Sequence, residues 1–223
     1  RGGGGMFNYK SSPTISGTAF NYNMLDNNGA GAGMHNRTNC NPSITNCTFE
    51  GNTSGDIGGG MYNYDNSSPT LNNCSFTSNA VNLYGGAMYN RFMCNPELTL
   101  CNFNANHAQN GGGAVMNSSQ SAPTFDDCSF TFNSCPGDMS KGGAVFNIIS
   151  NPTFSNCTFT SNAAKNGGAL FNALGSELVI SNSTISGNTS ANGSGAGMFF
   201  LYQSSVILTN SSITGNTGAV EGG

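Results

Sequence analysis

One repeating unit of this 223-residue chain reads Gly142-Gly143-Ala144-Val145-Phe146-Asn147 and then, after a short gap, Pro152-Thr153-Phe154-Ser155-Asn156-Cys157-Thr158-Phe159-Thr160-Ser161-Asn162. Each half of the unit closes on an Asn. The first Asn column comprises Asn8, Asn36, Asn63, Asn90, Asn117, Asn147 and Asn172, with Phe200 in the last unit. The second comprises Asn23, Asn52, Asn79, Asn106, Asn133, Asn162, Asn188 and Asn216. Both columns step by about 27 residues, a period typical of stacked supersecondary units.

The runs between these columns predict strands and no helices. Short strand-like runs are separated by Gly, Asn, Ser and Pro clusters, and no segment carries a long apolar pattern of helical period. Because no crossover helix fits within a unit, the period predicts an all-β, parallel β-solenoid in which each strand pairs one coil away. We expect one domain, residues 1–223, of about eight coils. The approximate repeats are 4–30, 31–57, 58–84, 85–111, 112–140, 141–165, 166–193 and 194–223.

Three apolar columns are predicted to point into the solenoid. The first, a structural core ladder, is Phe20, Phe49, Phe76, Phe103, Phe130, Phe159, Ile185 and Ile213. The second is Ile15, Ile44, Leu71, Leu98, Phe125, Phe154, Ile180 and Leu208. The third is Met6, Met34, Met61, Met88, Val115, Val145, Leu170 and Met198. The Asn columns suit left-handed turn geometry, and we expect their amides to hydrogen-bond from coil to coil as a structural ladder.

The composition argues against several classes of partner. Charged residues are only 7% of the chain, the net charge is −4, and there are only six Lys and Arg. Nucleic acid is a poor partner because phosphate binding needs a basic stripe. No apolar run is long enough for a membrane span. The chain starts at Arg1 rather than Met, so we expect a mature or excised region.

The eight cysteines have two readings. Cys47, Cys74, Cys101, Cys128 and Cys157 share one column with Thr18, Ser183 and Ser211, which favours buried thiols that act as small apolar groups. The alternative uses a seven-residue spacing and an extracellular compartment. It pairs Cys40 with Cys47, Cys94 with Cys101, and Cys128 with Cys135 in local disulfides. His35 and His107 have no matching ligand spacing, so we expect no metal and no cofactor.

The acidic residues do not predict an active site. Polysaccharide-cleaving β-helices need clustered carboxylates, either to bind calcium or as an acid–base pair. The ten acidic residues are dispersed over the coils, and strand alternation sends the adjacent Asp126 and Asp127 to opposite sides. We therefore expect no catalytic residues and no enzyme, with a polysaccharide-cleaving enzyme as the less favoured alternative.

Two outward columns are candidate binding surfaces. A Thr/Ser ladder, interrupted at Glu50, Asn102 and Asn104, resembles the hydroxyl ladders of ice-binding solenoids; its simpler reading is ordinary exposed strand residues. Its members are Thr48, Ser75, Asn102, Ser129, Thr158, Thr184 and Ser212 on one side, and Thr77, Thr131, Thr160, Ser186 and Thr214 on the other. The second is a stripe of Phe7, Tyr62, Tyr89, Phe146, Phe171 and Phe199, together with His35 and Met116. If the Met column points inward, this stripe points outward and suits sugar stacking; the alternative is that the stripe is buried and the Met column exposed.

The motifs resemble those of the polymorphic membrane protein (Pmp) repeat family. The GGA-aliphatic motif is Gly85-Gly86-Ala87-Met88, Gly112-Gly113-Ala114-Val115, Gly142-Gly143-Ala144-Val145 and Gly167-Gly168-Ala169-Leu170. The F-x-x-N motif runs from Phe20 to Asn23, Phe49 to Asn52, Phe76 to Asn79, Phe103 to Asn106, Phe130 to Asn133 and Phe159 to Asn162. Ile185 and Ile213 replace the Phe in the last two copies. The resemblance implies a right-handed β-helix at a bacterial surface, where several family members are adhesins.

The two ends of the chain are in phase. Arg1-Gly2-Gly3-Gly4-Gly5 opens directly before Met6, and Gly222-Gly223 closes where the next aliphatic position would follow. Either the chain is cut from a longer solenoid, or one copy stacks on the next as a head-to-tail filament. The sequence thus predicts a non-enzymatic, extracellular, cell-surface structural or adhesive solenoid. Its expected partners are itself, flanking segments of a longer surface protein, glycans or a host cell surface. The alternative is a carbohydrate- or ice-binding module that uses an outward column.

Overall fold

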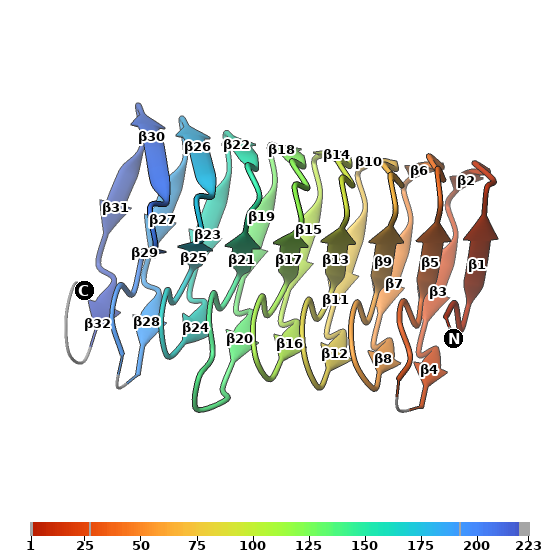
Figure 1. Ribbon diagram of the computed structural model, residues 1–223, viewed down its shortest axis with the longest axis horizontal. Coiled ribbons are helices and arrows are strands. Elements are labelled where there is room, and N and C mark those ends of the chain that lie inside the picture. Colours follow the sequence, from red (N-terminus) through yellow and green to blue (C-terminus); the bar gives the residue numbers. More distant parts are fainter. Residues whose placement is uncertain (1, 27, 192, 219–223) are drawn as a thin grey trace.

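The computed structural model describes residues 2–26, 28–191 and 193–218, and these form a stack of eight coils (Figure 1). Every coil contributes one strand to each of four eight-stranded sheets, and all pairings are parallel. The predicted all-β parallel solenoid is therefore confirmed. Arg1, Gly222 and Gly223, which carry the argument from in-phase ends, lie outside the described residues. No helix in the described ranges is long and apolar enough to cross a membrane.

Sheets 1 and 2 are formed by the first two strands of each coil. Sheet 1 contains β1 (Met6–Tyr9), β5 (Met34–Arg37), β9 (Met61–Tyr64), β13 (Met88–Arg91), β17 (Val115–Ser118), β21 (Val145–Ile148), β25 (Leu170–Ala173) and β29 (Met198–Leu201). Sheet 2 contains β2 (Thr14–Ser16), β6 (Ser43–Thr45), β10 (Thr70–Asn72), β14 (Glu97–Thr99), β18 (Thr124–Asp126), β22 (Thr153–Ser155), β26 (Glu177–Ser181) and β30 (Ser205–Thr209).

Sheets 3 and 4 are formed by the last two strands of each coil. Sheet 3 contains β3 (Ala19–Asn21), β7 (Thr48–Glu50), β11 (Ser75–Thr77), β15 (Asn102–Asn104), β19 (Ser129–Thr131), β23 (Thr158–Thr160), β27 (Thr184–Ser186) and β31 (Ser212–Thr214). Sheet 4 contains β4 (Met24–Leu25), β8 (Thr53–Ser54), β12 (Ala80–Val81), β16 (His107–Ala108), β20 (Ser134–Cys135), β24 (Ala163–Ala164), β28 (Thr189–Ser190) and β32 (Thr217–Gly218).

The core lies inside the coils and is built from columns of like residues. Phe49, Phe76, Phe103 and Phe130 are fully buried, and their rings stack almost parallel with centroids 4.6 to 5.0 Å apart. The coil spacing of a parallel sheet, about 4.8 Å, matches the contact distance of stacked rings. The Phe, Ile/Leu and Met/Val columns all contribute to this one cluster.

Buried Asn side chains form a hydrogen-bonded ladder along the axis. The Asn106 Nδ2 donates to the carbonyl oxygen of Phe76 (2.9 Å) and to Oδ1 of Asn133 (3.0 Å). Its own Oδ1 accepts from the backbone N–H and the Nδ2 of Asn79 (3.0 and 2.9 Å). The same pattern runs from Asn23 to Asn216. Because the amides from Asn52 to Asn188 are buried and paired, the ladder makes polar groups compatible with a dry core.

The first Asn column forms a second ladder on sheet 1. Each Nδ2 donates to the Oδ1 one coil further along, from Asn8 to Asn36 (2.8 Å) through Asn147 to Asn172 (2.7 Å). The ladder ends at Asn172, whose buried Nδ2 has no hydrogen-bond partner. The eighth coil places Phe200 in this register, and a phenyl ring cannot accept the bond in the amide's place.

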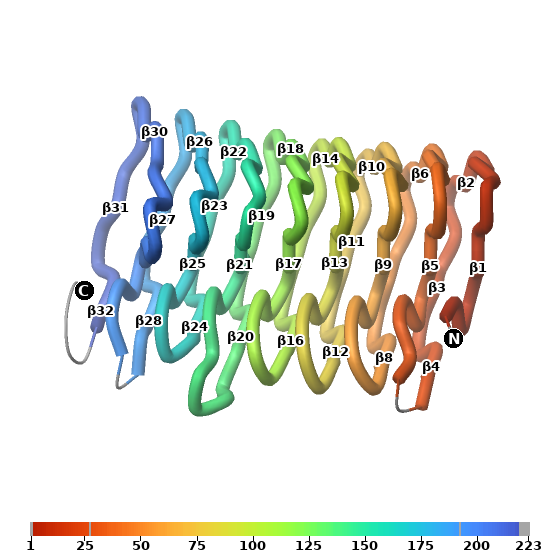
Figure 2. The backbone as a smooth tube through the Cα atoms, viewed as in Figure 1, coloured from red at the N-terminus to blue at the C-terminus, as the bar shows by residue number. Residues whose placement is uncertain are grey.

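Most of the difference in coil length lies in the segments between sheet 4 and sheet 1, which we call the loop edge (Figure 2). Between sheets 1 and 2 the coils differ by only one residue. Asn117 and Asn147 are 30 residues apart and Asn147 and Asn172 only 25, yet both pairs keep the same hydrogen bond. Most loops return through the Gly-Gly motif, and the loops into the second and eighth coils return through Gly31-Ala32-Gly33 and Gly195-Ala196-Gly197. Gly142 has a φ of +66°, and a Cβ on Gly143 would collide with the carbonyl oxygen of Gly168. Glycine therefore suits the turn at positive φ, whereas Ala32 and Ala196 take the place of Gly143 in the second and eighth coils.

Candidate binding surfaces

The predicted aromatic stripe on sheet 1 points away from the core but is mostly not exposed. Tyr62, Tyr89, Phe146 and Phe171 are only 2 to 7% exposed, so the prediction of an exposed stripe is wrong for these four residues. Phe7, in the first coil, is 47% exposed, and Phe199 is half-buried. The alternative of an exposed Met column is also excluded, because Met34, Met61 and Met88 are fully buried.

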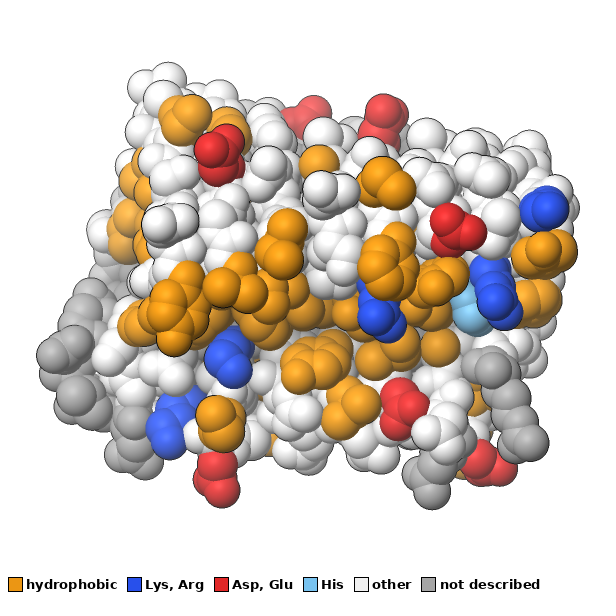
Figure 3. Space-filling view, viewed as in Figure 1, with side chains coloured by type: hydrophobic (Ala, Val, Ile, Leu, Met, Phe, Trp, Pro, Cys, Tyr) orange, Lys and Arg blue, Asp and Glu red, His pale blue; other side chains and the backbone are white. Residues whose placement is uncertain are grey.

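A second apolar cluster on the outer face of sheet 1 covers the stripe. Ile57 and Tyr84 belong to a column of isolated β-bridges at the loop edge, and they pack on the stripe from one side. Tyr64, Ile148 and Leu201, at the ends of β9, β21 and β29, pack on it from the other. The stripe is thus a small core of its own, seen as the orange band in Figure 3. Its rings stabilise the loop edge rather than meet a ligand.

His35 lies in this cluster between two aromatic rings. Its ring centroid is 5.1 Å from that of Phe7 and 4.8 Å from that of Tyr62. Both ring nitrogens are buried and have no hydrogen-bond partner. Burial, with a smaller contribution from the charge of Arg37, lowers the pKa of His35 to about 4. The imidazole is therefore neutral in the native state at neutral pH.

We expect the neutral His35 to make stability depend on pH. Between the unfolded pKa of about 6.5 and the native value, only the unfolded chain binds this proton, so the free energy of unfolding falls as the pH falls through that window. The full effect is about 3 kcal/mol at low pH. His35→Phe should remove it, because Phe occupies the same column in other coils. Urea unfolding at pH 7 and pH 4.5 tests this, and equal pH dependence in wild type and His35→Phe would contradict it. Burial also lowers the pKa of the half-buried His107, so His107→Ala should remove a smaller part of the pH dependence.

The structure does not form the three local disulfides; all eight cysteines are free and buried. The reason is that an extended strand separates the members of each proposed pair. Between Cys40 and Cys47 lies β6, and the two thiols donate instead to local carbonyls, Cys40 to Arg37 (3.2 Å) and Cys47 to Thr45 (3.3 Å). The other two pairs are likewise separated: β14 lies between Cys94 and Cys101, and β19 between Cys128 and Cys135.

Burial also makes these thiols poor nucleophiles. It raises the pKa of Cys94 to about 11 and that of Cys135 to about 12. Thiolate is the reactive form of cysteine, so little of either thiol is reactive at neutral pH. Among the described residues no group of three or more His, Cys, Asp or Glu side chains is arranged to hold a metal ion.

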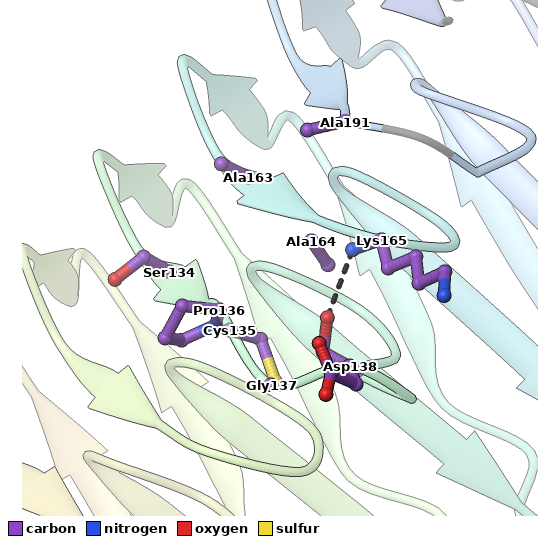
Figure 4. A pocket seen from close by; sticks show the side chains of 10 residues that line it. Ser134, Cys135, Pro136, Gly137, Asp138, Ala163, Ala164, Lys165 and Ala191 are labelled. Carbon is purple, nitrogen blue, oxygen red and sulfur yellow. Dashed lines mark hydrogen bonds between the residues drawn. The ribbon is translucent and has the colours of Figure 1, made fainter.

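Two shallow depressions lie between sheet 4 and the loop edge. One, of about 350 Å³, is lined by Cys135, Asp138 and Lys165 among others (Figure 4). There the backbone N–H of Lys165 donates to the Ser140 hydroxyl (2.9 Å), which ties two successive loops together. The other, of about 500 Å³, includes His107, whose Nδ1 lies 3.2 Å from the Ser134 hydroxyl. Both are open to solvent and bring together few charged groups.

The Thr/Ser ladder on sheet 3 faces outward but is interrupted. The Ser129 hydroxyl donates to Oδ1 of Asn102 (2.6 Å), so part of the hydroxyl row is already paired within the protein. Glu50 stands in the same sheet and accepts a hydrogen bond from the Tyr22 hydroxyl (2.9 Å). The ladder therefore lacks an unbroken run of free hydroxyl groups along its length.

A third surface, which the sequence interpretation missed, runs along the other edge of sheet 1. Tyr9, Arg37, Tyr64 and Arg91 occupy consecutive rungs of one outward column, here called the cation–aromatic column. The Arg37 Cζ lies 5.9 Å from the centre of the Tyr64 ring, and the Arg91 Cζ lies 4.6 Å from that of Phe92. In the sequence, this surface is indicated by a cationic residue directly beside an aromatic residue at the ends of equivalent strands, as in Tyr9-Lys10 and Arg91-Phe92.

These features define the class of protein. Parallel pairing of equivalent strands in every coil, around one internal core, is the architecture of a parallel β-helix. A family model described as a right-handed β-helix region matches residues 1–144 and 93–222. The chain belongs to this right-handed β-helix family. No curated protein and no solved structure gives a match to it.

Proposed function

We propose that this chain is a non-enzymatic, extracellular β-helix with a structural or adhesive role, similar to the passenger segments of Pmp-type surface proteins. The positions of the motif residues support this proposal. In the F-x-x-N motif, Phe76 stacks in the core and Asn79 joins the buried amide ladder. In the GGA-aliphatic motif, Gly142 makes the return turn. Each motif residue thus has a defined structural role in the coil.

The observation that carries the structural role is the last described coil, which leaves the core columns uncovered. Ile213 is 43% exposed and Leu208 is 38% exposed, whereas Ile185 and Ile180, one coil earlier, are fully buried. The strands β29 to β32 each pair on one side only within the described residues. An apolar, half-paired sheet edge is a template for another strand layer. We propose that a further coil covers it, supplied by a second copy in a head-to-tail filament or by a flanking segment of a longer surface protein.

A charge in the core column of this coil should prevent end-to-end association. We expect Ile213→Lys to remain folded, since the side chain is largely exposed, and to sediment as a monomer at concentrations where the unmodified chain associates. Thr214→Lys adds the same charge on the outward side of β31 and should still associate. Electron microscopy should show filaments with an axial repeat of about 38 Å, eight coils at about 4.8 Å each.

The two arms of the proposal give different results. If the unmodified chain forms filaments and the Ile213→Lys variant does not, the result supports stacking of one copy on the next. If the wild-type chain stays monomeric at every concentration, the filament is excluded. The remaining arm of the proposal is that a flanking segment of a longer surface protein covers the last described coil. Filaments that form equally with Ile213→Lys would mean that the contact lies on the side of the rod. Adhesion to glycans or cells is tested separately, by the binding of fluorescent monomer to a cell surface.

A further inference from the structure

Five of the buried cysteines are stacked in consecutive coils at the corner between sheet 2 and sheet 3. We call this set the thiol column: Cys47, Cys74, Cys101, Cys128 and Cys157. Each cysteine directly precedes the sheet 3 strand of its coil, and these strands pair in register. Adjacent strands of a sheet are about 4.8 Å apart, so the column repeats at that distance.

The five thiols have the same orientation. Each Sγ donates to the carbonyl oxygen two residues earlier in the chain, at 3.1 to 3.4 Å. The sulfur atoms therefore form a row parallel to the helix axis. Neighbouring thiols also act on one another. Contact with the Cys101 thiol, together with burial, raises the pKa of Cys74, and contact with Cys128 raises the pKa of Cys101 to about 12.

The fold does not require sulfur at this position. In the seventh coil Ser183 accepts a hydrogen bond from the backbone N–H of Cys157 (3.0 Å) and donates to the carbonyl oxygen of Ser181 (2.7 Å). The Cys47 Sγ accepts the equivalent bond, from the Thr18 N–H, only at 3.5 Å. A hydroxyl thus satisfies the backbone better than a thiol does. What a thiol adds here, besides apolar packing, is affinity for soft metal ions.

The spacing of the row suits an ion that is held by two sulfurs. A metal–thiolate bond is about 2.3 Å long, so an ion midway between two sulfurs needs them about 4.6 Å apart, close to the coil spacing. Cu(I) and Ag(I) are soft monovalent cations that accept two thiolates in a line. Ions that need more ligands do not fit, because the described part of the chain arranges no group of three or more His, Cys, Asp or Glu side chains to hold one.

Monovalent ions would leave the core neutral. When one binds, an S–H bond breaks, a sulfur–metal bond forms and the proton goes to solvent, so each added positive charge is matched by one thiolate. The five sulfurs of the row enclose four gaps between adjacent coils. Four ions with four thiolates and one remaining thiol therefore carry no net charge. This balance matters because an uncompensated charge in a dry core is very costly.

The row lies close to solvent although its sulfurs are buried. Each cysteine directly follows an exposed turn residue with a positive φ: Asn46, Asn73, Leu100, Asp127 and Asn156. Only this one-residue turn separates each thiol from the surface. Local opening of the corner is therefore enough to admit an ion, and the coil itself need not unfold.

We propose that the thiol column binds soft monovalent cations, Cu(I) or Ag(I), one between each pair of adjacent coils from the second to the sixth. The spacing of ligands along the chain does not reveal such a site, because its two sulfurs come from equivalent positions of successive repeats. The bound ions would join five coils to one another. The inference does not depend on the proposed structural or adhesive role, and it holds equally for a monomer and for a filament.

Native mass spectrometry counts the bound ions. The purified chain is titrated with Ag(I), and separately with Cu(I) in the absence of oxygen, with reduced glutathione present. Glutathione keeps the thiols reduced and removes ions that one thiol holds alone, whereas two thiols fixed at one site compete through their high effective concentration. We expect four retained ions per chain, one for each gap, and no retained Zn(II), which takes four ligands. If neither Ag(I) nor Cu(I) is retained, the proposal is wrong.

Two double variants with equal numbers of thiols separate adjacency from thiol content. Cys74→Ser combined with Cys128→Ser leaves no two neighbouring thiols in the column and should retain no ion. Cys47→Ser combined with Cys74→Ser leaves three neighbouring thiols and should retain two ions. Both variants should fold, since Ser occupies this position in the last two coils. Equal ion counts in the two variants would overturn the proposal.

A cysteine outside the column is the control. Cys94 belongs to another column, in which Ser67 and Ser121 are its neighbours, and its backbone N–H donates to the Ser121 hydroxyl (3.2 Å). Cys94→Ser should therefore still retain four ions. Circular dichroism melting gives a second readout: Ag(I) should raise the melting temperature of the wild-type chain and leave that of Cys74→Ser with Cys128→Ser unchanged. A lower melting temperature of the wild type with Ag(I) would mean that the ion prefers the unfolded chain, and it would refute the site.

Discussion

Replacing Asn106 by Ala should destabilise the protein by about 4 kcal/mol, because it leaves buried polar groups without partners. The backbone N–H of Asn79 loses its acceptor, the Nδ2 of Asn79 keeps only its bond to the carbonyl oxygen of Phe49, and the carbonyl oxygen of Phe76 loses a donor. A buried polar group left unsatisfied costs about 1–3 kcal/mol, so the backbone N–H and the one unpaired amide hydrogen of Asn79 together account for most of this loss. Urea unfolding followed by circular dichroism measures it.

The control lies two residues away on the outside of the same coil. Asn104 is exposed, and Asn104→Ala should change the stability by less than about 0.5 kcal/mol. Asn106→Leu separates the hydrogen bonds from the loss of volume: it fills the site with apolar atoms and should remain strongly destabilising. If Asn106→Ala is no more harmful than Asn104→Ala, the amide ladder does not stabilise the helix.

Phe103→Ala should lower the stability by a similar amount, about 4 kcal/mol, through a cavity in the ring stack. Phe103 is fully buried, with its ring 5.0 Å from that of Phe76 and 4.7 Å from that of Phe130. Truncation removes both stacking contacts and the edge contact with Phe125 at 6.2 Å. The expected result is a lower urea midpoint, measured as for the amide ladder.

Two further variants test the cause. Phe103→Ile should be much milder than Ala, because coils seven and eight already place Ile185 and Ile213 in this column. Phe132→Gly removes a phenyl ring of the next coil that is 63% exposed on a backbone with φ of 56°. It should leave the stability unchanged or raise it by up to about 1 kcal/mol, because Gly accepts this conformation without strain. Equal losses in Phe103→Ala and Phe132→Gly would refute the stacking argument.

The repeat period was sufficient to predict the coil and its strand pairing. It places Phe76 beside Phe103, and Tyr62 beside Tyr89, one coil apart, as the structure has them. The alternation of a strand also predicts which side of the sheet each residue faces. These are properties of regular backbone, and regular backbone is what a sequence pattern describes best.

The errors have separate causes. Alternation shows that Tyr62 points away from the core, but only the path of the loop edge decides that Ile57 and Tyr84 pack on the cluster that contains it. Likewise the seven-residue spacing of Cys40 and Cys47 is compatible with a disulfide until β6 is known to be extended between them. The cation–aromatic column was missed for another reason: a search for apolar periodicity gives no weight to an Arg at an outward position.

The loop edge has a consequence for how such a chain diversifies. The ladder from Asn117 through Asn147 to Asn172 keeps its hydrogen bonds although successive coils differ by five residues in length. Insertions and deletions there leave the register of all four sheets unchanged, so selection can alter the loops independently of the scaffold. Each duplicated coil also brings its own loop, which can then diverge without harm to its neighbours. The rod therefore combines a constant framework with one edge at which the length and the sequence of each coil can vary.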